Sequence, residues 1–312
     1  MNFLQRFLNF FTKKQVLFRI GDIVFLYYGL IIAVTMFFAY LIGGVVLQSF
    51  SVEAWIMPYL IVFTIPLIPV FSRMIPLLLY PIDFLKNPRK TFRNNWFSYL
   101  GGFIGFWIGY GSLIAFFGLD LLRLSDAIFL LLPFAHALGR LASINYGCCG
   151  LGVEDKKTKG LYFCYNNPDA MVSEVLNMKN KRLVPVHLYE MLLNFALGFL
   201  MIFVLFSVET HGFVSGIYLV GYGLIRFYLE PQRLEDKKIL FRKYSLYQIL
   251  LTLIFVGFGV VFFVLAFSSD TQIILSFSFD YIYNSLKNIP IIFLMSVVAF
   301  VLFGMRVRKR NV

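Results

Sequence analysis

Two arginines lie inside otherwise apolar stretches, and their type and placement suit the binding of an anionic ligand. Arg140 lies in HALGRLASINYGCCGLG (136–152) and Arg226 lies in GYGLIRFYLEPQR (221–233). An ionisable side chain inside a membrane-spanning segment is costly, so it marks a functional site by default. A guanidinium is a planar fork of donors that binds phosphate bidentately. Two such groups on different helices predict a site for the phosphate of a phospholipid headgroup.

Other titratable side chains lie at helical spacing from these arginines. His136 is one turn before Arg140, and Glu230 is one turn after Arg226 on the same helix face. The sequence PVHLYE, near the start of another apolar stretch, adds three more polar side chains: His187, Tyr189 and Glu190. A simpler alternative is that Arg226 and Glu230 only neutralise each other as a buried pair. It explains Arg140 less well, since no acidic residue lies within one turn of it.

The cysteines leave three interpretations open. Cys148 and Cys149 are adjacent, and Cys164 follows fifteen residues later. A thiolate near a histidine would be a nucleophile, and three thiols with a histidine could bind zinc, although this spacing fits no standard zinc motif. Alternatively, the thiols pack a helix end as small apolar groups. No metal ion and no cofactor are predicted.

Membrane-spanning helices must position these residues. The chain of 312 residues is 60% hydrophobic and 14% charged, with a mean hydropathy of +0.79, whereas a soluble domain is about 45–50% apolar and about 25% charged. This composition excludes a soluble enzyme, a disordered chain and a nucleic-acid-binding module. The net charge of +12 is therefore interpreted against a bilayer.

Eight stretches approach the roughly 20 apolar residues that a spanning helix needs, and they predict an all-α, polytopic transmembrane helical bundle. Six are uncharged: 23–52, 54–72, 94–119, 191–208, 244–269 and 288–305. Two more, 127–152 and 212–229, each contain one of the two arginines.

Three segments are expected outside the spans. Residues 1–19 predict an amphipathic helix at the membrane interface rather than a signal peptide. Residues 271–286 are expected to lie in the interface as well. The polar segment 154–182, between the fourth and fifth spans, predicts a small extramembrane cap.

The basic residues are divided very unequally between the two sides. Both termini and loops two, four and six hold 24 of the 28 Lys and Arg residues, and the loops of the other side hold two. The positive-inside rule therefore predicts that the termini and these three loops are cytoplasmic.

The order and spacing of seven motifs resemble the prolipoprotein diacylglyceryl transferase family, from about Ile20 to Gly257. In chain order the motifs are LYYGLIIA, FSRMIPLLLY, YLGGFIG, GRLASINYGCCGLG, PVHLYE, GYGLIRFYLEPQR and YSLYQIL. Members of this family move a diacylglyceryl group from phosphatidylglycerol to the thiol of a lipoprotein cysteine. The resemblance implies seven spans of the family type, to which 288–305 adds an extra C-terminal span. It divides the chain into an interfacial segment (1–19), a membrane domain (20–267, with a cap at 153–184) and a C-terminal part with a basic tail (268–312).

The resemblance, together with the polar residues described above, assigns residues to roles. The candidate catalytic residues are Arg140, Arg226, His136, His187 and Tyr222. The candidate substrate-binding residues are Tyr28, Arg73, Gly101, Gly102, Ser143, Cys148, Tyr189, Glu190 and Glu230. Glycines 105, 109 and 111 are expected only to pack helices, and Asp126 matches the aspartate that opens the family's fourth span.

Several positions depart from the family pattern. The histidine of its His-Gly-Gly motif is Leu100 here, its signature asparagine and acidic residue are Ser143 and Cys148, and its fifth-span glutamine is His187. Because leucine cannot accept a proton, we expect His136 or His187 to deprotonate the acceptor thiol.

The charge partition also departs from the family, whose reactive face is outside the cell and opposite its basic loops. Either the chain is inserted the other way up, with its site facing the cytoplasm, or its basic loops are an enlarged external site for anionic headgroups. The one-sided partition favours the first explanation.

Three functions remain open for a protein of the bacterial cytoplasmic (inner) membrane that binds no nucleic acid. The first is the family reaction, with phosphatidylglycerol as donor and a prolipoprotein cysteine as acceptor. The second keeps a phospholipid donor but uses a different, cytoplasmic acceptor. The third is a non-catalytic phospholipid-binding protein.

Overall fold

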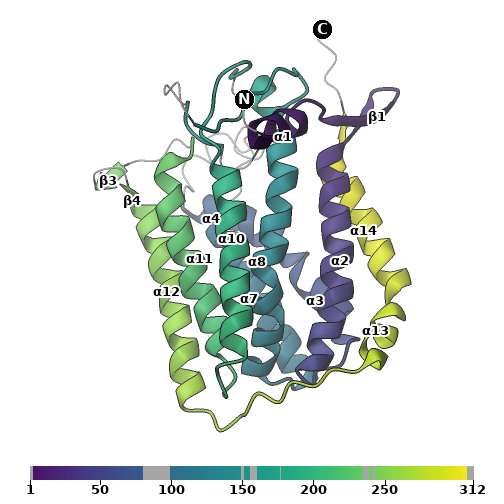
Figure 1. Ribbon diagram of the computed structural model, residues 1–312, viewed down its shortest axis with the longest axis vertical. Coiled ribbons are helices and arrows are strands. Elements are labelled where there is room, and N and C mark those ends of the chain that lie inside the picture. The colour runs from purple at the N-terminus through teal and green to yellow at the C-terminus, as the bar shows by residue number, and fades with distance from the viewer. Residues whose placement is uncertain are drawn as a thin grey trace.

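The structure is a computed structural model that describes residues 3–79, 99–148, 151–154, 160–175, 177–234, 239–241 and 244–307. Helices make up most of these residues, and the long ones run side by side as one bundle (Figure 1). The prediction of an all-α, polytopic bundle is confirmed, and the chain is an integral membrane protein.

The bundle contains six long helices, two broken helix pairs and three short helical segments among the described residues. The long helices are α2 (Tyr27–Ser49), α7 (Tyr99–Phe117), α8 (Leu121–Tyr146), α10 (Val186–Leu205), α11 (Phe213–Leu229) and α12 (Leu246–Phe267). The broken pairs are α3 (Ile56–Thr64) with α4 (Leu67–Leu79), and α13 (Phe279–Leu286) with α14 (Ile289–Gly304). The short segments are α1 (Phe3–Phe11), α9 (Met171–Val175) and the 3₁₀ turn η1 (Glu230–Gln232).

The helices account for all eight predicted apolar stretches. Six helices within the described part of the chain are long and apolar enough to cross a bilayer, counting α3 with α4 as one, and the pair α13–α14, bent by 57°, would be a seventh crossing. α11 has 17 residues, the lower limit for a spanning helix, and runs between α10 and α12 (Figure 1). Residues 279–286, which the sequence places in the interface, form α13 at the bend.

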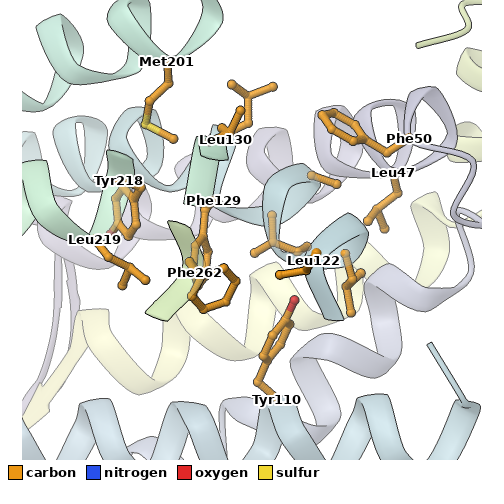
Figure 2. Close-up of a cluster of buried hydrophobic side chains, with 14 of the residues drawn as sticks. Leu47, Phe50, Tyr110, Leu122, Phe129, Leu130, Met201, Tyr218, Leu219 and Phe262 are labelled. Carbon is orange, nitrogen blue, oxygen red and sulfur yellow. The ribbon is translucent and has the colours of Figure 1, made fainter. Parts of the chain in front are cut away.

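The core of the bundle is a cluster of buried apolar side chains in which α8 takes the central place, packed against α2, α10 and α11. Figure 2 shows side chains that six helices contribute to it: Leu47, Tyr110, Phe129, Met201, Tyr218 and Phe262. Because lipid tails are as apolar as these side chains, the core stabilises the bundle through close van der Waals packing rather than through the removal of apolar surface from water.

Glycines let α7 approach the α3–α4 pair closely. A Cβ on Gly101, Gly105 or Gly109 would collide with backbone atoms of the facing helix, so the three positions act as a small-residue packing face. The predicted packing role of Gly105 and Gly109 is confirmed. The same prediction was wrong for Gly111, because that glycine borders open space rather than another helix.

Asp126 joins α8 to the start of α11 at the end of the bundle opposite the termini. Its carboxylate accepts hydrogen bonds from Gly212 N (2.7 Å), Ser215 N (2.8 Å) and Ser215 Oγ (2.6 Å), and the side chain is fully buried. The first amides of a helix have no partner within that helix, so this carboxylate satisfies them from a neighbouring helix.

We expect Asp126→Asn to lower the free energy of unfolding by about 1–3 kcal/mol, because an amide has only one acceptor oxygen and leaves buried donors unpaired. Asp120→Asn is the matched control, since Asp120 caps α8 at an exposed position through Arg123 N (2.7 Å) and asparagine caps equally well. Denaturation in detergent measures both, and equal effects would contradict the role assigned to Asp126.

The N-terminal segment differs from the predicted helix over residues 1–19. The helix α1 ends at Phe11, and β1 (Val16–Ile20) pairs with β2 (Ile23–Leu26) as a hairpin. The reason is local: Gly21 takes a left-handed conformation (φ +57°) in a two-residue turn between β-branched and aromatic residues. β5 (Met305–Val307) completes a three-stranded sheet in the order β1-β2-β5, and β3 (Ile239–Phe241) pairs separately with β4 (Tyr244–Ser245).

The segment between α8 and α10 folds as a cap over the end of the bundle where both termini lie (Figure 1). Within it Phe163 and Leu183 pair through their backbones, and their side chains pack with Tyr165 and with Leu8 of α1. Gln5 of α1 also exchanges hydrogen bonds with the backbone of the cap. The cap therefore has a small core of its own, which α1 helps to cover.

Candidate functional site

Five charged side chains meet beneath the cap, where α8, α10 and α11 come together. Arg140 Nη2 donates to Glu190 Oε1 at 2.8 Å. Arg226 Nη1 lies 3.9 Å from the same oxygen, and Arg226 Nη2 lies 3.2 Å from Glu230 Oε2. Arg233 pairs with Glu190 Oε2, and its Nε lies 3.6 Å from Glu230 Oε2. Glu190 thus contacts all three arginines of this cluster.

The five-residue cluster is buried and carries an excess of positive charge. Glu190 is 0% exposed, and the most exposed side chain of the cluster is Arg140 at 18%. Burial and the neighbouring Arg226 lower the pKa of Arg233 to about 10, which leaves it charged at neutral pH. Three guanidiniums against two carboxylates leave one positive charge. Guanidinium groups bind anionic oxygens through charge-assisted hydrogen bonds, so this cluster suits a ligand with a negative charge.

The chain after α11 folds back to bring Arg233 into the cluster. Arg226 and Glu230 face each other at i, i+4 spacing, and Pro231 is the second residue of the turn η1, which begins at Glu230. A proline at the start of a helical turn cannot continue the preceding ladder of hydrogen bonds, so the chain changes direction here. Gly152 of the cap forms a β-bridge with Arg233, and Val153 N donates to Gln232 O at 2.9 Å. The base of the cap is therefore bonded to the segment that carries Arg233.

A histidine and two tyrosines lie next to the cluster, farther into the bundle. His136 Nδ1 lies within hydrogen-bonding distance (3.1 Å) of Tyr218 Oη. The ring of Tyr222 stacks on Tyr218 and lies 5.0 Å from the His136 ring, centroid to centroid. His136 is only partly buried, and a Cβ built on Gly139 would meet no atom within 4 Å. The surface of α8 thus borders open space at Gly139, three residues after His136 and one before Arg140.

The second candidate base lies in a different environment. His187 is fully buried in the first turn of α10, and its ring lies 6.2 Å from that of Phe163 in the cap. It is three residues from Glu190 on the same helix. The contacts that the structure describes for its ring are thus with the core of the cap, whereas those of His136 are with the two tyrosines.

The remaining predicted substrate-binding residues are spread around this end of the bundle. The ring of Tyr28 lies 5.5 Å from that of Tyr146, the last residue of α8. Ser143 and Cys148 are buried at the same end, Tyr189 is half-buried, and Arg73 lies on an exposed face of α4. Cys149 lies outside the described residues.

Gly101 and Gly102 were predicted to bind substrate, and the structure places both against α4. A Cβ on Gly101 would collide with the backbone of Phe71, and one on Gly102 would lie 2.8 Å from Ser72 Oγ. These contacts are those of helix packing, and a substrate contact at either glycine stays a prediction. Over the part of the chain that the structure describes, no group of three or more His, Cys, Asp or Glu side chains is placed to hold a metal ion.

Two residues of the site, Arg233 and Tyr218, had no role predicted from the sequence. Arg233 was counted among the basic loop residues, although its place three residues after Glu230 was a usable signal. Tyr218 follows the same face of α11 as Tyr222, one turn earlier. The pairing of Arg140 with Glu190 joins two helices, so no spacing within one segment could have predicted it.

Comparison with known proteins gives consistent matches. The sequence model of a family described as prolipoprotein diacylglyceryl transferase matches residues 15–265. A phosphatidylglycerol–prolipoprotein diacylglyceryl transferase of Chlorobaculum tepidum is 28% identical over 190 residues, covering 59% of this chain and 61% of the relative. A protein of the same name from Buchnera aphidicola is 31% identical over 179 residues, covering 51% of this chain and 61% of the relative. The match thus spans about three fifths of each relative's length, and the family match stops before α13.

Proposed function

The chain belongs to the prolipoprotein diacylglyceryl transferase family, and from this premise we propose that it transfers a diacylglyceryl group from phosphatidylglycerol to the thiol of a prolipoprotein cysteine. The observation that carries the proposal is the buried cluster of three arginines and two glutamates. The phosphate diester of phosphatidylglycerol has one negative charge, which balances the excess charge of the cluster. The names of the two relatives include both substrates.

In the proposed reaction the acceptor thiolate attacks the glycerol carbon that bears the phosphate ester. A carbon–sulfur bond forms, the carbon–oxygen bond breaks, and glycerol phosphate leaves with the electron pair. The charge on the phosphate rises from one to two as it leaves. Guanidinium groups already held in place stabilise such developing charge without reorganising. We assign this role to Arg140 and Arg226, which Glu190 and Glu230 hold in position.

We assign the role of base to His136. It is partly exposed one turn from Arg140, and its Nδ1 lies within hydrogen-bonding distance of Tyr218 Oη, which orients the ring. The thiol must lose its proton before it can attack, and a neutral imidazole nitrogen can accept it. The buried position of His187 against the cap supports a structural role for that residue.

We therefore expect His136→Gln to lower turnover by on the order of 10²-fold, in the range of general-base contributions, and His187→Gln, its matched control, to lower it less. Only the neutral imidazole accepts a proton, so turnover of the parent protein falls as the pH drops through the pKa of the histidine. In the His136→Gln variant we expect this decrease of turnover at low pH to be absent. Equal losses from the two substitutions, with unchanged pH profiles, would contradict the assignment.

Incubation of the purified protein with labelled phosphatidylglycerol and a cysteine-containing lipoprotein signal peptide tests the proposed function. We expect release of glycerol phosphate together with labelled peptide. Release without peptide labelling would indicate a different acceptor, and lipid binding without release would indicate a binding protein. Either result would contradict the proposed transfer of a diacylglyceryl group to a prolipoprotein cysteine.

The second candidate function differs in the acceptor. The cap and both termini lie at one end of the bundle (Figure 1), and the arginine cluster lies beneath the cap. From the sequence, the termini and loops two, four and six hold 24 of the 28 basic residues. The positive-inside rule supports a cytoplasmic position for this end in the bacterial inner membrane. In that orientation the acceptor would be a thiol on the cytoplasmic side.

Labelling of single added cysteines with a membrane-impermeant maleimide decides the orientation. With the basic end in the cytoplasm, Ser268→Cys after α12 is labelled in intact cells, and Lys179→Cys in the cap is labelled only in inverted vesicles; both positions are exposed. Background from the native thiols is expected to be slow, since Cys148 is buried and burial raises the pKa of the Cys164 thiol. The parent chain is the control. Labelling of position 179 in intact cells would place the site outside and favour a translocated acceptor.

A further inference from the structure

The C-terminal segment beyond the family match reaches the end of the bundle that holds the site. α14 packs along α2 so closely that a Cβ on Gly29 would collide with the backbone of Gly304. At the other end of α2, Gln48 Nε2 donates to Tyr281 O of α13 at 2.9 Å. Between them, these contacts fix the added span against α2 along its length.

The strand β5 then places one arginine at a defined position. β5 pairs with β2, with Val24 opposite Arg306 and Phe25 opposite Met305. Because the backbone is held by this ladder, the guanidinium of Arg306 has a restricted reach. It lies beside the end of α8 on one side and the cap on the other.

Arg306 bonds to both of these parts at once. Its Nη1 donates to Tyr146 Oη at 3.1 Å, and its Nη2 forms an ion pair with the carboxylate of Glu174 in α9 of the cap. The ion pair with Glu174 also raises the pKa of Arg306, so the contact is charged at any physiological pH. A guanidinium suits this arrangement because its several donors point in fixed directions.

Tyr146 connects Arg306 to the helix that carries part of the site. It is the last residue of α8, the helix that carries His136 and Arg140, and its ring contacts that of Tyr28 (5.5 Å between centroids). The next residue, Gly147, has a left-handed conformation (φ +67°), and a Cβ there would press on Tyr165 and Val172 of the cap. The chain turns tightly here, so a movement of Tyr146 would displace the cap as well.

We propose that Arg306 is a positioning residue for the donor site, which holds the end of α8, Tyr28 and the cap in register. The added C-terminal span then contributes to the donor site through the contacts of Arg306. The effect on lipid turnover rests on the proposed function, through the headgroup contact of Tyr28, whereas the register of α8 and the cap does not depend on it.

Stability alone would not test this proposal, because a partly exposed ion pair contributes little to the free energy of unfolding. The test uses the full chain in lipid nanodiscs with two readouts: kcat and KM for phosphatidylglycerol, and hydrogen exchange of the peptides that cover 144–148 and 171–175. Arg306→Ala removes both contacts. Tyr146→Phe removes only the hydroxyl, and Glu174→Gln removes only the charge on the cap.

Arg19→Ala is the matched control. Arg19 Nη2 pairs with Asp169 of the cap at 2.9 Å, from β1 of the same sheet, with a comparable partial exposure and with no described contact to α8. We expect Arg306→Ala to raise KM by roughly 10-fold with kcat nearly unchanged, the pattern for a lost contact of ground-state binding. Exchange should become faster in both peptides. Tyr146→Phe should reproduce the change in KM and in 144–148, and Glu174→Gln the change in 171–175.

Equal KM values and equal exchange for Arg306→Ala and Arg19→Ala would overturn the proposal. Restoration of KM by Arg306→Lys would also overturn it, because lysine keeps the charge but lacks the rigid fork whose two terminal nitrogens reach Tyr146 and Glu174 separately. If the parent protein itself releases no glycerol phosphate, the proposed function fails. The exchange readout then still decides whether Arg306 holds the cap and α8 together.

Discussion

Arg140→Lys is expected to remove most of the release of glycerol phosphate while the bundle stays folded. A lysine keeps the positive charge but loses the planar fork of donors. In the cluster its compact head lacks the fixed geometry that lets a guanidinium pair with Glu190, as Arg140 does at 2.8 Å, and also present donors to the ligand phosphate in a planar fork. Loss of one preorganised donor to a developing anion costs about 10²–10³-fold in turnover.

Arg123→Lys is the control for this substitution. It makes the same chemical change on the same helix, in the first turn of α8 and far from the cluster. We expect it to turn over lipid as the parent does, and both variants to unfold at the parent temperature. If Arg140→Lys retained parent turnover, the phosphate would have to be held elsewhere, and the proposed mechanism would lose its main support.

Glu190→Gln is expected to lower the free energy of unfolding by about 3–5 kcal/mol, the usual consequence of removing one partner from a buried ionic group. Glu190 contacts all three arginines and is fully buried. Without its charge, three guanidiniums face one carboxylate, and water cannot solvate the difference. Denaturant titration of the protein in detergent micelles measures the loss.

The control is Glu154→Gln, which breaks an ion pair that is exposed to solvent rather than buried. Glu154 pairs with Lys181 at 3.3 Å, and both side chains are 44% exposed, so we expect a change of about 0–1 kcal/mol. Added phosphatidylglycerol should recover part of the stability of Glu190→Gln, because a ligand that binds only the folded state stabilises it by mass action. Equal destabilisation by the two substitutions would show that the charge of Glu190 contributes no more to stability than the charge of an exposed ion pair.

The bundle was predictable because its determinants are local. Runs such as 23–52 and 244–269 can be read directly as spans, and Arg140 and Arg226 stand out because they interrupt such runs. The hairpin at Gly21 was missed for a related reason: the basic and aromatic residues around it fit an amphipathic helix, and a single two-residue turn decided otherwise.

The site was predictable only in part, because its geometry depends on contacts between segments distant in the chain. The contact between Arg140 and Glu190 joins residues fifty positions apart. From the sequence, His136 and His187 were equivalent candidates for the base. Packing separates them, since His136 is partly exposed beside Tyr218 and His187 is fully buried against the cap.

The order of strands in the small sheet has a consequence for how the protein is made. β2, at residues 23–26, is among the first elements to leave the ribosome, and its partner β5, at 305–307, is among the later ones. Throughout synthesis one edge of the hairpin therefore stays without its strand, and a contact of this sequence separation forms slowly. Arg306 reaches Tyr146 and Glu174 only when that strand is in place. A chain terminated between Arg233 and β5 would contain every residue of the arginine cluster but would lack the contacts of Arg306 with Tyr146 and Glu174.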